Sequence, residues 1–230
     1  MILTDERWRE LLHVRATNPG AVRQAYATRR RRSRLVSDQG TLFLVAADQA
    51  AGEGRRTLLE RLLVALANPA VDGVLGTPDI VEELLLLGAL HDKVVFGTMN
   101  PDGGFTGYDA RTLVDCGLDG GELLLPGPAR QACADAVTEL AAYGLVALIE
   151  LPEALAPSVT RASALGTTSA YTWLKLPATA SPAVLDATTL PVLLGGLPPD
   201  RTLSHGVVRG LVMNPAGNVE AAAKALEAAK

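Results

Sequence analysis

Cysteine and histidine are scarce in this 230-residue chain. Only Cys116 and Cys133 occur, and their spacing matches neither a C-x-x-C motif nor a disulfide framework. The histidines, His13, His91 and His205, lie far apart and show no spacing for a shared metal ion. We therefore expect no structural zinc site, no metal-dependent chemistry and no cofactor.

Long apolar runs and a strong charge of one sign are also missing. Runs such as VEELLLLGAL (81–90) fall well short of a membrane span, and the charged start of the chain has no apolar core of signal-peptide length. The net charge of -4 gives no overall attraction to nucleic acid or to an anionic membrane. We expect a cytoplasmic protein that acts on a small molecule, with no nucleic-acid or membrane partner. Association into a homo-oligomer is left open.

Nucleotide-binding and hydrolase motifs are absent as well. No G-x-G-x-x-G follows the first predicted strand, no G-x-x-x-x-G-K-[ST] occurs, and no serine lies in a G-x-S-x-G elbow. These absences disfavour an open dinucleotide-binding sheet, a P-loop protein and an α/β-hydrolase.

What the sequence does contain is an alternation of short apolar runs and helical stretches. Such alternation is typical of βα units on a parallel sheet, and eight units favour closure into a single-domain (β/α)8 TIM barrel. The predicted strands are 41–47, 72–77, 93–97, 118–125, 144–150, 171–177, 190–195 and 206–213. The clearest predicted helices are 55–66, 79–90, 129–143 and 219–229, with room only for short helices after the fifth and seventh strands.

The residues before the first predicted strand are predicted to form a segment separate from the barrel. Residues 1–40 are predicted to be an N-terminal helical extension that closes the bottom of the barrel, and residues 41–230 to be the barrel itself. The extension is predicted to be helical over 5–27, with a break at 18–20. It ends in an arginine-rich run, 29–34, which lacks interleaved aromatic residues. We interpret this run as a solvated helix end paired with acids or phosphate ions, in preference to a nucleic-acid patch.

Lysine is rare, with four lysines against seventeen arginines, and one lysine lies within an apolar predicted strand. In YTWLKLP (171–177), Trp173 and Lys175 face the same way. Burial of Lys175 would lower its pKa and leave an amine able to attack a carbonyl and form an imine. The alternative is an unreactive Lys175 that pairs with Glu122 or Glu150 inside the barrel.

Further candidates follow from the active-site position in (β/α)8 barrels, at the carboxyl ends of the strands. Asp48, Glu122 and Glu150 lie at or near such ends, and they are candidate acid/base groups because imine chemistry needs a partner that moves protons. A carboxylate at a strand end can equally cap a helix or hold a basic side chain. Asn100, after the third strand, is a candidate substrate-binding residue.

Several segments are similar to one known family. They are the arginine-rich run before the first predicted strand (29–34), LVAAD (44–48), NPAVDGVLGTPDIVEELLLLGAL (68–90), FTGYDA (105–110), LDGG (118–121), GTTSAYTWLKLP (166–177) and ATTLPVLLGG (187–196). Through these segments, the chain resembles the actinobacterial deoxyribose-phosphate aldolase-like (β/α)8 proteins of the class I aldolase superfamily. The resemblance extends over nearly the whole chain. These proteins are often associated with inositol or sugar catabolism. The resemblance implies a Schiff-base lyase in which the sixth-strand lysine, here Lys175, forms the imine. It also implies that Gly195 and Gly196 keep half of a phosphate site as backbone N–H donors.

The chain departs from this family pattern at the mouth of the barrel. Gln49 stands where the family usually has His, Glu122 where it usually has Lys, and Asn214 ends a stretch that replaces a phosphate-holding Gly-Arg pair. A carboxylate near Lys175 would favour its ammonium form and weaken the nucleophile.

Three functions therefore stay open. The first is an aldolase-like lyase that acts on a small sugar or carbonyl compound, with or without a phosphate group. The second is a dehydratase or isomerase that uses the imine. The third is a catalytically degenerate barrel that serves as a binding or partner protein.

Overall fold

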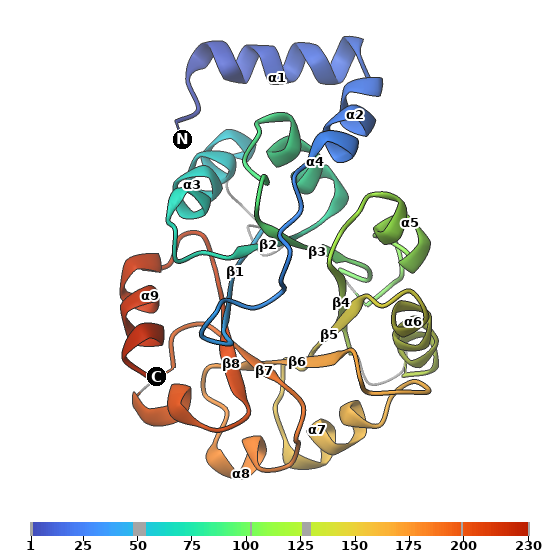
Figure 1. Cartoon of the computed structure of the whole chain (residues 1–230), viewed down its shortest axis with the longest axis vertical. Coiled ribbons are helices and arrows are strands. Elements are labelled where there is room, and N and C mark those ends of the chain that lie inside the picture. The colour runs from blue at the N-terminus through green and yellow to red at the C-terminus, as the bar shows by residue number, and fades with distance from the viewer. Residues whose placement is uncertain (1, 48–53, 102, 126–129, 199, 230) are drawn as a thin grey trace.

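The computed structural model describes residues 2–47, 54–101, 103–125, 130–198 and 200–229, and these form a closed, parallel, eight-stranded barrel. The strands follow one another in chain order, and the last closes the barrel against the first (Figure 1). They are β1 (Leu42–Ala46), β2 (Gly73–Gly76), β3 (Val94–Thr98), β4 (Gly120–Leu124), β5 (Val146–Glu150), β6 (Thr172–Pro177), β7 (Val192–Gly195) and β8 (Val208–Met213). Each predicted strand is present, so the predicted (β/α)8 TIM barrel is confirmed.

Helices surround the ring of strands (Figure 1). The described helices are α1 (Asp5–Thr17), α2 (Gly20–Thr28), α3 (Arg55–Ala67), α4 (Pro78–Leu86), α5 (Ala110–Asp115), α6 (Arg130–Ala142), α7 (Ala156–Ser163), α8 (Pro182–Leu185), the 3-10 helix η1 (Asp200–Ser204) and α9 (Val219–Ala228). Helices α3, α6 and α9 follow the predicted ranges closely, and the segments after β5 and β7 hold only α7 and η1, as predicted. None of the described helices is both long and apolar enough to cross a membrane.

Helix α4 ends earlier than its periodicity predicts. The predicted helix runs to residue 90, but the regular helix stops at Leu86. Gly88 adopts a left-handed φ of 69°, and its N–H donates to the carbonyl oxygen of Leu85. Glycine reaches this conformation without the penalty that a side chain brings, so the apolar residues after it continue the core as a turn.

Alternate residues of the strands face two different apolar cores. Leu42, Leu44 and Phe96 belong to a cluster inside the barrel, whereas Phe43 and Val45 pack outward beneath the helices. Parallel strands covered in this way are buried on both faces, which explains the nearly continuous apolar runs in the sequence.

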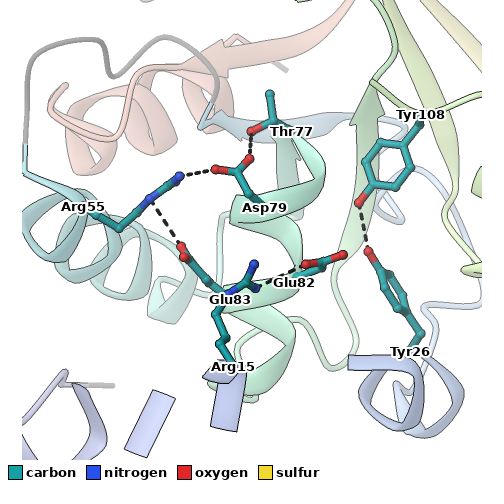
Figure 2. A network of polar contacts seen from close by, with 8 residues as sticks. All are labelled: Arg15, Tyr26, Arg55, Thr77, Asp79, Glu82, Glu83 and Tyr108. Carbon is teal, nitrogen blue, oxygen red and sulfur yellow. Dashed lines mark hydrogen bonds and ion pairs between the residues drawn. The ribbon is translucent and has the colours of Figure 1, made fainter. Parts of the chain in front are cut away.

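Residues 1–40 contribute α1, α2 and a connecting segment. Helix α2 packs against α4, and α1 runs along the outer edge of the molecule beyond α3 and α4 (Figure 1). The hydroxyl groups of Tyr26 on α2 and Tyr108 meet at 2.9 Å (Figure 2). Leu35 and Val36 of the connecting segment pack against the inner cluster of the barrel. The domain boundary at residue 40 stays a prediction.

The arginine-rich run lies along the amino ends of the strands and is paired with acids, as predicted. It is not solvated throughout, because Arg29 is buried and its guanidinium group donates to the carbonyl oxygens of Lys93 and Gly117. The ion pairs are Arg29 with Asp119 at 3.7 Å, Arg30 with Asp92 at 2.6 Å, Arg31 with Asp119 at 3.4 Å, Arg32 with Asp72 at 2.5 Å and Arg34 with Asp38 at 2.7 Å. The pairs with Asp72, Asp92 and Asp119 attach the connecting segment to the segments that lead into β2, β3 and β4.

Candidate active site at the carboxyl ends of the strands

Lys175 on β6 lies with its ammonium group between two carboxylates. Its Nζ is 2.7 Å from Oε1 of Glu122 on β4 and 3.1 Å from Oε2 of Glu150 on β5. Glu150 and Lys175 are partners in the β5–β6 register, which brings their side chains together. Glu122 comes from two strands away and reaches Lys175 through the interior of the barrel. The structure therefore brings together three of the four predicted catalytic residues.

This cluster is largely shielded from water. The side chains of Lys175 and Glu122 are 4% and 2% exposed, and that of Glu150 is 19% exposed. The hydroxyl of Thr98 on β3 donates to Oε2 of Glu122 at 3.3 Å. Carboxylates at such distances favour the ammonium form in a low dielectric, whereas burial opposes it. Lys175 is thus both buried and paired with carboxylates, and these two features shift its pKa in opposite directions.

A cavity of about 250 Å³ opens beside this cluster. Lys175 and the more exposed carboxylate, Glu150, form part of its wall. The other lining residues are Ala46, Leu151, Pro152, Leu176, Pro177, Gly195, Gly196, Val212 and Asn214. Drug-sized ligands occupy sites of about 300–1,000 Å³, so this cavity suits a smaller molecule.

Asn100 lies at the end of β3 but is not part of the cavity wall. It is fully buried, its Nδ2 donates to the carbonyl oxygen of Leu124 at 2.7 Å, and its Oδ1 accepts the N–H of Leu124 at 2.8 Å. These two hydrogen bonds tie the segment after β3 to β4. The position of Asn100 thus supports a structural role in place of the predicted contact with substrate. Asp48 and Gln49 lie outside the described residues.

Gly195 and Gly196 do line the cavity, but one of their predicted donors is already used. The N–H of Gly196 donates to the carbonyl oxygen of Val212 at 2.8 Å. Asn214 lines the same wall, and its Oδ1 accepts the N–H of Ala216 at 2.8 Å. The half phosphate site expected here therefore lacks the free Gly196 donor that it needs.

A second polar network lies beside the end of β2 (Figure 2). The hydroxyl of Thr77, the N-cap of α4, donates to Asp79 at 2.5 Å, and Arg55 on α3 pairs with Asp79 and lies 3.6 Å from Glu83. Burial raises the pKa of Glu83, whose Oε2 accepts no hydrogen bond from the described residues. The network joins α3 to α4 and supports the rim of the barrel.

Thr98 is a residue that the sequence reasoning missed. Its period-2 spacing from Phe96 places it on the inner face of β3, and this spacing is the signal that would have found it. Within the described ranges, no group of three or more His, Cys, Asp and Glu side chains could hold a metal ion.

The comparisons with known proteins identify a family. The family model described as Cgl0159-like matches residues 39–214, a range that includes all eight strands. The chain belongs to the Cgl0159-like family. A crystal structure of Cgl0159 from Corynebacterium glutamicum is 33% identical, with a TM-score of 0.86, and the match covers 100% of this chain and 98% of that one.

Two more solved structures share the fold of this Cgl0159-like protein at lower identity. The N-acetylmannosamine-6-phosphate 2-epimerase from Clostridium perfringens is 12% identical, with a TM-score of 0.54 over 81% of this chain and 92% of that one. The 3-dehydroquinate dehydratase from Geobacillus kaustophilus is 10% identical, with a TM-score of 0.52 over 82% of this chain and 91% of that one. A search of curated proteins found no match. The family name states no activity, so the aldolase-like assignment stays a prediction.

Proposed function

We propose that this Cgl0159-like protein is a class I, metal-independent aldolase-like lyase that forms an imine between Lys175 and a small sugar or carbonyl compound. The observation that carries the proposal is the position of Lys175 Nζ within 3.1 Å of two carboxylates, at the wall of a small cavity. An imine-forming lysine needs a carbonyl in reach and a group that exchanges protons, and this site offers room for the first and residues for the second.

Formation of the imine begins with loss of a proton from Lys175. Glu122 is the acceptor in this proposal because it is the nearer carboxylate and the more buried. The free amine attacks the carbonyl carbon and gives a carbinolamine. The hydroxyl group leaves as water with the proton returned by a carboxyl group, and the product is a protonated imine.

Cleavage follows from the electron demand of the protonated imine. Glu150 takes the proton of the hydroxyl group on the carbon β to the imine carbon, because Glu150 lines the cavity. The bond between the α and β carbons breaks, its electron pair moves toward the imine nitrogen, and an aldehyde leaves. Protonation of the resulting enamine and hydrolysis of the imine release the second product and restore Lys175. Asp48 stays a predicted further proton carrier.

A second function is favoured by one specific observation. Glu122 stands where the resembled family usually has Lys, and its contact with Lys175 favours the unreactive ammonium form. A barrel that binds a sugar without turning it over would keep the same cluster as a structural ion pair.

Reductive trapping separates these functions. Wild type, Lys175→Arg and the surface control Lys224→Arg are treated with sodium borohydride in the presence of acetaldehyde, glyceraldehyde, dihydroxyacetone or the phosphates of the last two. Wild type and Lys224→Arg are expected to gain the mass of one reduced adduct, and Lys175→Arg none. Arginine keeps a cation between the carboxylates, so circular dichroism should show a folded Lys175→Arg variant.

Product analysis then defines the reaction. Release of two carbonyl compounds from one substrate indicates a lyase, and loss of water alone indicates a dehydratase. If wild type forms no adduct with any of these compounds, the imine proposal fails and the binding barrel is favoured.

A further inference from the structure

A second cavity, of about 390 Å³, lies next to the Lys175 cavity. Leu151 and Pro152 line both cavities, and they directly follow Glu150 in the chain. The second cavity extends to the first residue of α6, Arg130, and to Ser158 and Arg161 on α7. Leu151 and Pro152 therefore form a wall that the two cavities have in common.

The second cavity is basic. Two guanidinium groups, those of Arg130 and Arg161, line it against one carboxylate, that of Glu153, which leaves a formal net charge of one positive. Within the described residues, neither arginine lies within 4.0 Å of a carboxylate oxygen. Arg161 donates to the hydroxyl oxygen of Ser158, three residues earlier on the same helix, at 3.3 Å. Arginines without an acidic partner are suited to phosphate and carboxylate groups.

The Lys175 cavity, by contrast, is unfavourable for an anion. Glu122 and Glu150 lie against Lys175 and repel a further negative charge. On the β7–β8 side, the N–H of Gly196 donates to the carbonyl oxygen of Val212, and the lining residue Asn214 carries no charge. A substrate with one carbonyl and one anionic end is therefore best placed with its carbonyl at Lys175 and its anionic end in the basic cavity.

We propose that Arg130 and Arg161 bind an anionic group, a phosphate or a carboxylate, at the end of the substrate remote from the carbonyl. This inference rests on the proposed function for the position of the carbonyl, and it adds a substrate class: small carbonyl compounds with one terminal anion. It places the anion on the β4–β5 side of Lys175, and not at Gly195 and Gly196.

Matched pairs of carbonyl compounds test this subsite. The initial rate at which the borohydride-trapped adduct forms is measured at substrate concentrations below saturation. Glyceraldehyde 3-phosphate is compared with glyceraldehyde, and succinic semialdehyde with butanal. The variants are Arg130→Gln/Arg161→Gln and a control, Arg111→Gln, which changes an exposed arginine on α5. Wild type and the control should trap at least one anionic compound faster than its neutral partner by about tenfold or more. The double variant should lose that preference and still trap glyceraldehyde.

The outcomes separate the two proposals. Equal rates within both pairs in wild type, or a preference that survives in the double variant, overturn the subsite while the imine stands. The pair that shows the preference identifies the anion as phosphate or carboxylate. If no adduct forms at all, titration calorimetry with inorganic phosphate and with succinate tests the subsite directly. Binding by wild type that weakens about tenfold in the double variant supports it, and no binding of either anion by wild type overturns it.

Discussion

The two ends of the barrel both carry buried or half-buried ion pairs, but the pairs are built differently. At the amino end, Asp72 accepts the backbone N–H of Phe43 at 2.7 Å while it pairs with Arg32, and Asp119 accepts the N–H of Val95 at 2.8 Å. These carboxylates hold neighbouring strands together. At the carboxyl end, the carboxylates of Glu122 and Glu150 meet on a lysine beside a cavity.

The same contrast applies to lysine. At the amino end, Lys93 is half-buried, its Nζ donates to the carbonyl oxygen of Val71 at 2.5 Å, and burial lowers its pKa. At the carboxyl end, Lys175 lines a cavity of about 250 Å³. An amine needs both access and a proton acceptor in order to react, so a lowered pKa alone does not make an active site.

The largest expected effect is that of Lys175→Met. The substitution removes the cation from between Glu122 and Glu150, and the loss of one partner from a buried ion pair costs about 3–5 kcal/mol. We expect urea denaturation to show this loss and trapping to show no adduct. The exposed control Lys224→Met should change neither. A Lys175→Met variant as stable as wild type would mean that the cluster contributes little to folding.

Asp72→Ala should affect stability and leave trapping intact. The substitution leaves the N–H of Phe43 and the guanidinium of Arg32 without their acceptor, at a cost of about 1–3 kcal/mol. Urea denaturation measures the loss, and the adduct yield per folded molecule should equal that of wild type. A reduced yield in the folded variant would contradict the separation between the two ends.

Glu83→Gln is expected to have a smaller effect that depends on pH. Burial raises the pKa of Glu83, so the folded chain holds this proton more tightly than the unfolded chain does. The contribution of Glu83 is therefore most favourable below its unfolded pKa of about 4.3, and it is lost as the pH rises through the folded value. Glutamine stays neutral, so the stability of Glu83→Gln relative to wild type should increase as the pH rises above the unfolded pKa of about 4.3. An unchanged difference in urea midpoint would show that the pairing with Arg55 cancels the cost of burial.

The smallest effect is expected for Arg34→Ala. Its ion pair with Asp38 joins side chains that are 72% and 90% exposed. Solvent screening leaves such pairs little net stabilisation, so the free energy of unfolding should change by less than about 0.5 kcal/mol. A loss as large as that of Asp72→Ala would show that the arginine-rich run acts as one cooperative network.

Much of the fold could be predicted from the sequence, because buried parallel strands are continuous apolar runs and the helices between them have a clear period. Element ends were predicted less well where one glycine decides them. Gly88 stops α4 before an apolar stretch that continues the helical pattern.

The sequence offered the pairing of Lys175 with Glu122 or Glu150 as one of two alternatives, but it could not decide between them. Glu150 and Lys175 are register partners on adjacent strands, but Glu122 lies on β4, and its contact with Lys175 depends on how three strands are staggered. The role of Asn100 depends on side-chain direction. Its amide turns to the backbone of Leu124, which no sequence spacing predicts.

The most direct test of the account is to locate the trapped adduct. Wild type reduced with borohydride in the presence of a carbonyl compound is digested, and tandem mass spectrometry identifies the modified lysine. We expect an adduct on Lys175, at the carboxyl end, and none on Lys93, although burial lowers the pKa of Lys93. An adduct on Lys93 with Lys175 unmodified would contradict the assignment of the active site to this end of the barrel.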